Sequence, residues 1–222
     1  MAKHKLRIIL NSNIMYSTSG YASQLSEFIP LIRDEGYPIA CVNFYGQEGY
    51  KKEIDGIMHY PKIGDMWGGD AMVMHGQDFK ADVTFALQDL WVLNPDHIKA
   101  AKRFIPILPV DHEPIPPAIL DRVKLAYRVV SYSPFGYQEL LRNGIQSTYI
   151  PHTVDTEIFK PLPNRAELKK GMGIPEDYFV FGMVSANKDN LSRKCFQEVM
   201  DAVDMFHKKH PKSCLYFHSN LD

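Results

Sequence analysis

The sequence predicts an α/β protein, with one complete doubly wound, Rossmann-like domain followed by the incomplete start of a second. Short apolar runs alternate with longer segments whose apolar residues recur at helical spacing, a pattern typical of parallel strands joined by helices. The alternation is interrupted once, by a run at 149–161 that two prolines stiffen, and then resumes. We therefore expect domains at 1–150 and 164–222, joined by a linker at 151–163.

The strands of the first domain are short apolar runs. A strand of a mostly parallel sheet is covered on both faces, so it contains few polar residues. Runs of this kind occur at 6–10, 39–44, 83–87, 104–110, 128–132 and 148–150. The residues at 11–19 are polar and indicate a loop, whereas the segment 45–65 is rich in glycine and lysine and has no pattern that assigns it.

Helices fill the intervals between these strands. The first begins at Gly20 and stops at Gly36. Its apolar residues share one face: Tyr21, Leu25, Phe28, Ile29 and Ile32. Further helical segments are expected at 66–75, 94–102, 116–126 and 134–143. Proline marks the start of the last two, and Ser133 is the expected N-cap of the final one.

The second domain begins after the linker. Its expected elements are a helix at 165–172, a strand at 180–185, a helix at 193–209 and a strand at 213–218. Asn164 with Glu167 resembles a capping box for the first of these helices. Two parallel strands cannot bury a core of normal size, so this domain looks cut short. Either the chain is a fragment, or a partner subunit supplies further strands.

The composition is typical of a globular protein and argues against a nucleic-acid binder. The chain has 222 residues, of which 45% are hydrophobic and 23% charged, and its net charge of −1 lacks the basic surplus of a nucleic-acid binder. Cys41, Cys195 and Cys214 have no metal-ligand spacing, which favours reduced thiols in a cytoplasmic protein. The His residues form no metal-binding pattern either. No apolar run approaches the roughly 20 residues that span a bilayer.

Candidate ligand-binding loops follow from the fold class. Doubly wound sheets bind ligands at the carboxyl ends of their strands, which here points to the loops at 11–20, 88–93 and 110–116. Gly20 stands at a helix start, where backbone N–H groups bind anions, or it is a simple helix-start glycine. Asp111 and His112 form an ionisable cluster, or an ordinary surface loop. Asp89 and Trp91 follow another strand, and Trp91 either stacks on a sugar or packs in the fold.

The loop at 185–194 in the second domain is a further candidate, and it includes Asn187. It follows a strand and leads into a helix, an arrangement that favours a bound anion. Arg193 and Lys194 are expected in the first turn of that helix, where their charges oppose the helix dipole. A bound phosphate would explain two cations at this place. The alternative is that both are solvated surface residues.

Two segments resemble the GT-B retaining glycosyltransferases of family four, also called glycosyl transferases group 1. The family has Ile-Pro-Asn-Gly-Val-Asp followed by Phe-x-Pro between its domains. This chain has Ile-Pro-His-Thr-Val-Asp at 150–155 and Phe-Lys-Pro at 159–161, so His152 and Thr153 replace Asn and Gly. The segment FGMVSANKDNLSRKCFQEVMDA at 181–202 is similar to the strand, loop and helix with which the family binds the donor diphosphate.

The resemblance implies transfer of a sugar, with retention, from a UDP- or GDP-linked donor to a hydroxyl of a glycan, lipid or protein acceptor. It implies no metal and no cofactor beyond the nucleotide-sugar substrate. Arg193 or Lys194, with Gly20, would contact the donor phosphates. Asp111 or His112 would face the reacting sugar. Contacts to the sugar or acceptor are expected at Asp89, Trp91 and Asn187.

One part of the family pattern is missing. The family carries a pair of spaced glutamates later in its C-terminal domain, and this chain ends before that region. We therefore expect these residues alone to bind donor weakly and to turn over poorly or not at all. Two alternatives remain: a split or degenerate glycosyltransferase half that acts as a non-catalytic binding module, and an unrelated doubly wound nucleotide-binding enzyme. The first half has no phosphate fingerprint, which counts against the latter.

Overall fold

The structure is a computed structural model that describes residues 5–187 and 193–219. The chain divides into two compact units, Met1–Phe159 and Lys160–Asp222, here the first and the second unit. Among the described residues, no helix combines the length and apolar character that crossing a bilayer requires.

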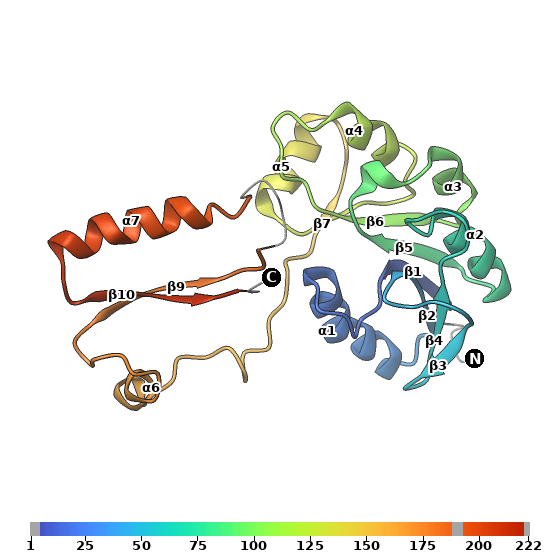
Figure 1. Cartoon of the computed structure of the whole chain (residues 1–222). Helices are drawn as coiled ribbons and strands as arrows, with labels where there is room; N and C mark the ends of the chain where they lie inside the picture. Colours follow the sequence, from blue (N-terminus) through green and yellow to red (C-terminus); the bar gives the residue numbers. More distant parts are fainter. Residues whose placement is uncertain (1–4, 188–192, 220–222) are drawn as a thin grey trace. The chain divides into compact units, whose positions relative to one another are not determined.

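The described part of the first unit is built on an eight-stranded sheet with the order β3-β4-β2-β1-β5-β6-β7-β8 (Figure 1). The strands are β1 (Ile8–Asn13), β2 (Ile39–Tyr45), β3 (Lys52–Ile54), β4 (Ile57–Pro61), β5 (Val83–Leu87), β6 (Phe104–Leu108), β7 (Val130–Ser131) and β8 (Thr148–Tyr149). Every neighbouring pair is parallel except β3 and β4. The predicted α/β fold with a mostly parallel sheet is therefore confirmed.

Helices cover the two faces of this sheet unequally. The helices are α1 (Gly20–Asp34), α2 (Gly69–Asp78), α3 (Pro95–Ala100), α4 (Pro117–Val123) and α5 (Pro134–Arg142). Leu25 and Ile29 of α1 pack against Leu10 and Leu87 in one apolar cluster. A larger cluster contains buried residues of α2 to α5, so these four helices lie on the opposite face (Figure 1).

Side-chain caps fix several helix starts. Ser19 accepts a hydrogen bond from the backbone N–H of Ala22 over 3.1 Å at the start of α1. Ser133 accepts one from Gly136 over 2.9 Å, which confirms the predicted cap of α5. Each bond satisfies a backbone donor that has no partner inside the helix.

Several predicted boundaries in the first unit are wrong. The predicted loop at 11–19 begins later, because β1 continues to Asn13 and its polar end still pairs with β2. The runs at 104–110 and 128–132 form strands only at Phe104–Leu108 and Val130–Ser131. The unassigned segment 45–65 contains the antiparallel hairpin of β3 and β4.

The second unit contains α6 (Arg165–Gly171), β9 (Phe179–Val184), α7 (Phe196–Lys209) and β10 (Ser213–His218). In its described part, β9 and β10 form a two-stranded parallel sheet along which α7 runs (Figure 1). The ring of Phe206 in α7 lies 5.1 Å from Phe181 in β9, edge to face.

The predicted capping box at the start of α6 is wrong. The Asn164 side chain makes no cap bond to the backbone in the described structure, and its amide donates to Glu167 Oε2 over 3.3 Å instead. This side-chain contact leaves the first backbone donors of α6 without the reciprocal pairing of a capping box.

Candidate functional site

The strand order of the first unit reverses between β1 and β5. The chain passes from β1 through α1 to β2 on one side, and from β5 through α3 to β6 on the other. Doubly wound sheets bind ligands at the carboxyl ends of the strands beside such a reversal. The loops after β1, β5 and β6 therefore define the candidate site, and they contain Gly20, Asp89, Trp91, Asp111 and His112.

Four side chains interact at this edge and form what we call the carboxyl-edge cluster: Tyr21, Asp89, Asp111 and Tyr132. The Tyr21 hydroxyl donates to Asp89 Oδ1 over 3.4 Å. Burial raises the pKa of Tyr21 strongly, and the charge of Asp89 raises it further, with smaller effects of Tyr132 and Asp111. Burial also raises the pKa of Tyr132, and Asp89 adds to it. Both phenols therefore stay protonated at neutral pH and can donate hydrogen bonds.

Asp89 is the carboxylate at the centre of these interactions. Desolvation raises the pKa of Asp89, the hydrogen bond from Tyr21 lowers it, and the nearby charge of Asp111 raises it. The net effect is that the pKa of Asp89 is raised. A carboxylate with a raised pKa beside solvent is suited to accept a hydrogen bond or a proton from a hydroxyl group.

Asp111 of this cluster forms an exposed pair with His112. His112 Nδ1 lies 2.5 Å from Asp111 Oδ1, and the two side chains are 66% and 75% exposed. The loop that carries them is anchored further on, where the backbone N–H of Ile115 donates to the buried Glu139 carboxylate over 2.9 Å. The pair is thus accessible to a ligand and stands on a fixed loop.

Gly20 and Trp91 also lie at this edge. A Cβ at Gly20 would meet nothing within 4 Å among the described atoms, so space is open beside the start of α1. Trp91 is 55% exposed. It stands on a short 3₁₀ turn (Leu90–Val92) that Leu90 and Leu93, both fully buried, hold in place.

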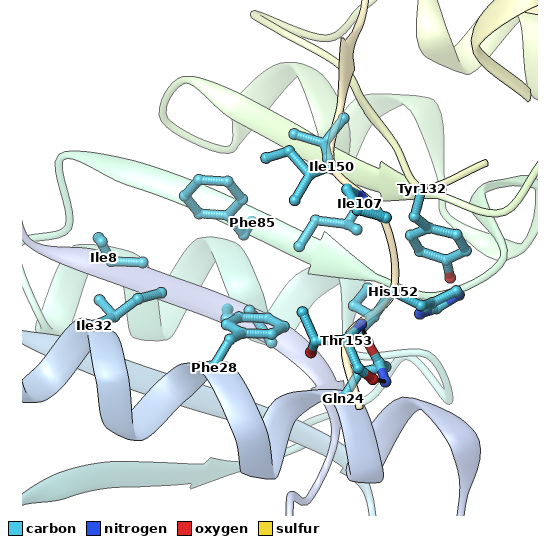
Figure 2. A pocket seen from close by; sticks show the side chains of 14 residues that line it. Ile8, Gln24, Phe28, Ile32, Phe85, Ile107, Tyr132, Ile150, His152 and Thr153 are labelled. Carbon is cyan, nitrogen blue, oxygen red and sulfur yellow. Dashed lines mark hydrogen bonds between the residues drawn. The ribbon is translucent and has the colours of Figure 1, made fainter. Parts of the chain in front are cut away.

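An apolar groove of about 310 Å³ adjoins the cluster on the α1 side of the sheet (Figure 2). Its walls are side chains of β1, β5, β6, β7 and α1, together with residues 150–153, and Tyr132 and His152 are among them. The centroids of the Tyr132 and His152 rings are 3.9 Å apart. Gln24 donates to the Thr153 carbonyl over 2.9 Å and accepts from its N–H over 3.1 Å, so α1 fixes this segment.

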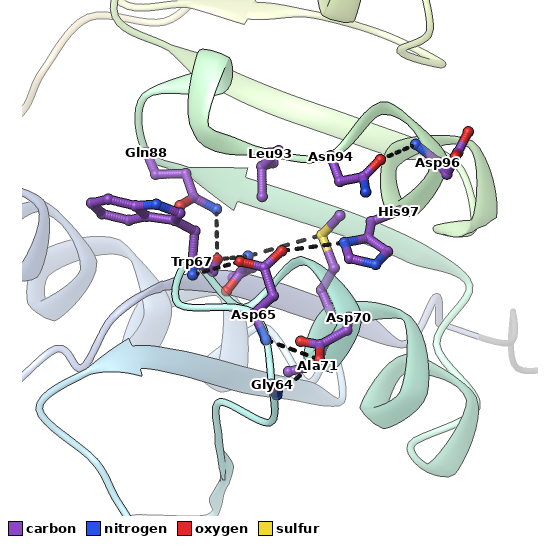
Figure 3. A network of polar contacts seen from close by, with 12 residues as sticks. Gly64, Asp65, Trp67, Asp70, Ala71, Gln88, Leu93, Asn94, Asp96 and His97 are labelled. Atoms are coloured by element: carbon purple, nitrogen blue, oxygen red, sulfur yellow. Dashed lines mark hydrogen bonds and ion pairs between the residues drawn. The ribbon is translucent and has the colours of Figure 1, made fainter.

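A polar network holds the loop between β4 and α2 (Figure 3). Asp70 accepts three backbone hydrogen bonds, from Gly64, Asp65 and Ala71. Burial alone would raise the pKa of Asp70, but these bonds outweigh it and hold the pKa below its ordinary value. Asp65 Oδ2 lies 3.2 Å from His97 Nδ1. The loop that carries Trp67 is therefore rigidly tied to its surroundings.

Apart from Gly20, the residues predicted to contact the donor phosphates lie in the second unit. Arg193 and Lys194 are exposed and precede α7, which begins at Phe196. Their predicted place in the first turn of that helix is wrong, because Cys195 at the N-cap has a left-handed backbone (φ 54°) that breaks the helical path. Asn187 is exposed after β9, and residues 188–192 of the predicted anion loop lie outside the described residues.

The structure adds residues that the sequence does not single out. Tyr21, Tyr132 and Trp67 all belong to the carboxyl edge of the first unit. Tyr132 directly follows β7, and Tyr21 is the second residue of α1, after the loop that follows β1. The rule that ligands bind at the carboxyl ends of parallel strands is the signal that could have identified both residues. In the described part of the chain, no group of three His, Cys, Asp or Glu residues is placed to hold a metal ion.

No protein-family model and no curated protein matches the sequence. Among solved structures, the fold is similar to one described as an S. aureus MnaA–UDP co-structure, with a TM-score of 0.61 and 13% sequence identity. The match covers 98% of this chain and 63% of that chain. At this identity the likeness establishes the fold, and this chain spans less than two thirds of the length of its structural neighbour.

Proposed function

We propose that the chain is part of a glycosyltransferase that uses a nucleotide-sugar donor, with the first unit on the acceptor side and the second on the donor side. The carboxyl-edge cluster is the observation that carries the proposal, since it gathers a carboxylate of raised pKa and two protonated phenols at the ligand-binding end of the sheet. The fold shared with a UDP complex supports a nucleotide-linked ligand.

Asp89 and the Asp111–His112 pair act on the acceptor side in this proposal. Asp89 accepts a hydrogen bond from an acceptor hydroxyl, and Tyr21 orients the carboxylate through its own bond. Asp111 and His112 face the reacting sugar. Such groups position the acceptor for attack, and positioning is a large part of the rate enhancement of transfer enzymes.

Arg193 and Lys194 bind the donor diphosphate in this proposal, with Asn187 contacting the sugar. Departure of the nucleoside diphosphate is the difficult event, and fixed positive charge at the leaving group lowers its barrier. Retention at the anomeric carbon, membership of family four and a cytoplasmic location are further parts of the proposal. They rest on the motifs at 150–161 and 181–202 and on the cysteines, which are free in the described structure.

Isothermal titration with UDP and with GDP tests the donor side. We expect weak binding of one nucleotide by the wild-type chain, and at least a roughly fivefold loss when Arg193 and Lys194 are both changed to Ala. Lys209→Ala, at the other end of α7, is the matched control for removal of positive charge. Binding that the double variant leaves unchanged would contradict the proposed donor site.

A non-catalytic module that binds a partner is the second candidate. Large apolar side chains are exposed in the second unit, among them Phe179 at 60%, Val184 at 74% and Met205 at 67%. Monomeric proteins rarely leave many such residues uncovered, and partner strands are one means of covering them. A mass above that of one chain in light scattering, with no nucleotide binding, would favour this candidate.

A further inference from the structure

Both tryptophans of the chain lie at the carboxyl edge of the first sheet. Trp67 follows β4 and Trp91 follows β5, and their exposed fractions are 38% and 55%. Trp67 is tied to the second of these loops, because its carbonyl accepts a hydrogen bond from the Gln88 side chain, three positions before Trp91. Two partly exposed aromatic residues thus stand in neighbouring loops at the end of the sheet where ligands bind, and Asp89 lies two positions before Trp91 in the chain.

The backbone of Trp67 is fixed from two sides. Its N–H donates to Asp65 Oδ1 over 2.8 Å, and its carbonyl accepts from Asn11 Nδ2 over 3.0 Å and Gln88 Nε2 over 3.4 Å (Figure 3). Its ring meets Phe44 edge to face, with the centroids 5.7 Å apart. A partly exposed indole held this firmly needs little ordering when a ligand stacks on it, which favours binding.

The charges around the two rings restrict the chemistry of that ligand. The loops at 14–19, 64–69, 88–94 and 109–116 contain no Lys or Arg, but they contain four carboxylates: Asp65, Asp89, Asp111 and Glu113. Of these, Glu113 is paired with Arg142 of α5. A phosphate group would meet carboxylates and no cation in these loops, which is unfavourable. Hydroxyl groups, in contrast, donate readily to carboxylates. The edge therefore suits a neutral, hydroxyl-rich ligand that has an apolar face.

We infer that Trp67 and Trp91 form a stacking platform for a saccharide acceptor, whose hydroxyl groups donate to Asp89. This inference rests on the proposed function and names the class of acceptor. A saccharide combines ring faces of C–H groups with many hydroxyl donors, which matches indole and carboxylate at one edge. A lipid acceptor would fill the apolar groove on the α1 side instead, and neither tryptophan lines that groove.

Intrinsic tryptophan fluorescence tests the platform directly, because Trp67 and Trp91 are the only two tryptophans. The full chain is first screened on an array of neutral oligosaccharides of hexoses and N-acetylhexosamines. The strongest binder is then titrated while emission is recorded. We expect binding with a change in emission, and at least a roughly tenfold loss of affinity in Trp67→Ala or Trp91→Ala.

Conservative variants keep the test valid if an alanine variant folds poorly. Trp67→Phe and Trp91→Phe retain an aromatic face, and we expect them to keep more affinity than the alanine variants do. Tyr127→Ala removes an aromatic ring that is 53% exposed in the same unit and outside these loops, so it serves as the matched control. We expect it to bind like the wild type.

Three results would overturn the inference: no oligosaccharide on the array binds, binding survives both alanine changes, or the emission responds to UDP or to phosphatidylcholine vesicles and to no saccharide. The proposed donor function is judged separately by the titration of the Arg193 and Lys194 variant. Nucleotide binding without saccharide binding would contradict the stacking platform and leave the donor proposal standing. Saccharide binding without nucleotide binding would contradict the donor proposal and leave the platform standing.

Discussion

His59 is a buried histidine that the fold keeps neutral. It lies on β4, where its Nδ1 is 3.0 Å from Asn43 Nδ2, and burial lowers its pKa from 6.5 to about 4. Because the folded pKa lies below the unfolded one, the unfolded chain takes up a proton first as the pH falls. The first unit therefore loses stability between about pH 6.5 and pH 4, and the loss levels off below that range.

We predict that His59→Asn flattens this pH dependence, because Asn retains an acceptor for Asn43 and does not titrate. The wild type should lose about 1–3 kcal/mol between pH 7 and pH 4 through this residue. Urea unfolding at several pH values measures the effect. Gln146→Asn, at an exposed residue that does not titrate, is the control and should unfold with the pH profile of the wild type. Equal slopes for His59→Asn and the wild type would refute the assignment.

Gly68 and Gly20 differ in the space available for a side chain. Gly68 has a φ of 70°, and a Cβ there would lie 2.7 Å from Asn11 Oδ1, whereas a Cβ at Gly20 meets open space among the described atoms. We predict that Gly68→Ala destabilises the first unit by about 1–3 kcal/mol. Gly20→Ala should be neutral or stabilise by up to about 1 kcal/mol. Thermal unfolding followed by circular dichroism compares the two variants, and a similar loss in both would be inconsistent with these contacts.

The positions of Asp89, Asp111 and His112 after predicted strands are enough to place these residues at the carboxyl edge of the sheet. The side chains that interact with them there are not evident from the sequence. Tyr21 and Tyr132 join that edge through space, since one begins a helix and the other follows a strand far along the chain. The sequence does not single out Trp67 either, because its partners are distant in the chain. The network that holds it uses Asn11, which looks like a loop residue in the sequence but lies buried inside β1.

The start of α5 shows how much one capping residue contributes to an element. Ser133 satisfies the N–H of Gly136, so Ser133→Ala should cost about 1 kcal/mol of the free energy of unfolding. Ser26→Ala is the control within the same unit, because Ser26 lies inside α1, is exposed and caps nothing. Chemical denaturation of both variants measures the difference, and the prediction fails if the control loses as much as the cap variant.

Elements with uniform patterns were predictable, and those that rely on local exceptions were not. The run at 83–87 is apolar except for Thr84 and matches β5 to the residue. The hairpin of β3 and β4 has no alternating apolar pattern that assigns its strands, although Asp55 and Gly56, both at positive φ, are a strong signal for a two-residue turn. The end of β1 is polar, so the sequence predicts a loop there, yet Ser12 is buried and donates to the Leu87 carbonyl over 2.7 Å.

The division of the whole chain into two units predicts where a protease cuts first. Ile158 and Phe159 are 69% and 71% exposed, and the first unit ends at Phe159. We predict that brief treatment with chymotrypsin cleaves after Phe159 and leaves a resistant fragment of the first unit, identified by mass spectrometry. Phe159→Ser should slow this cut. Early cleavage inside the first unit would contradict the division.

The overall class of the first unit was predictable because a parallel sheet needs the same apolar run in every strand and a helix between each pair. The order of the strands was not predictable from the sequence. The strand β1 pairs with both β2 and β5, and no residue pattern specifies which strands become neighbours. The candidate site depends on that order. Its residues were therefore foreseen as separate loops rather than as one cluster.

The reversal of strand order has a practical consequence for engineering. The strands β4 and β5 are paired to their neighbours by backbone bonds upstream of the Trp67 and Trp91 loops, so their register is set outside the exposed residues of those loops. In the proposed function, acceptor preference is therefore open to change through the exposed residues of these two loops while the sheet beneath them stays intact. Variation among natural sequences of this type should concentrate in the same two places.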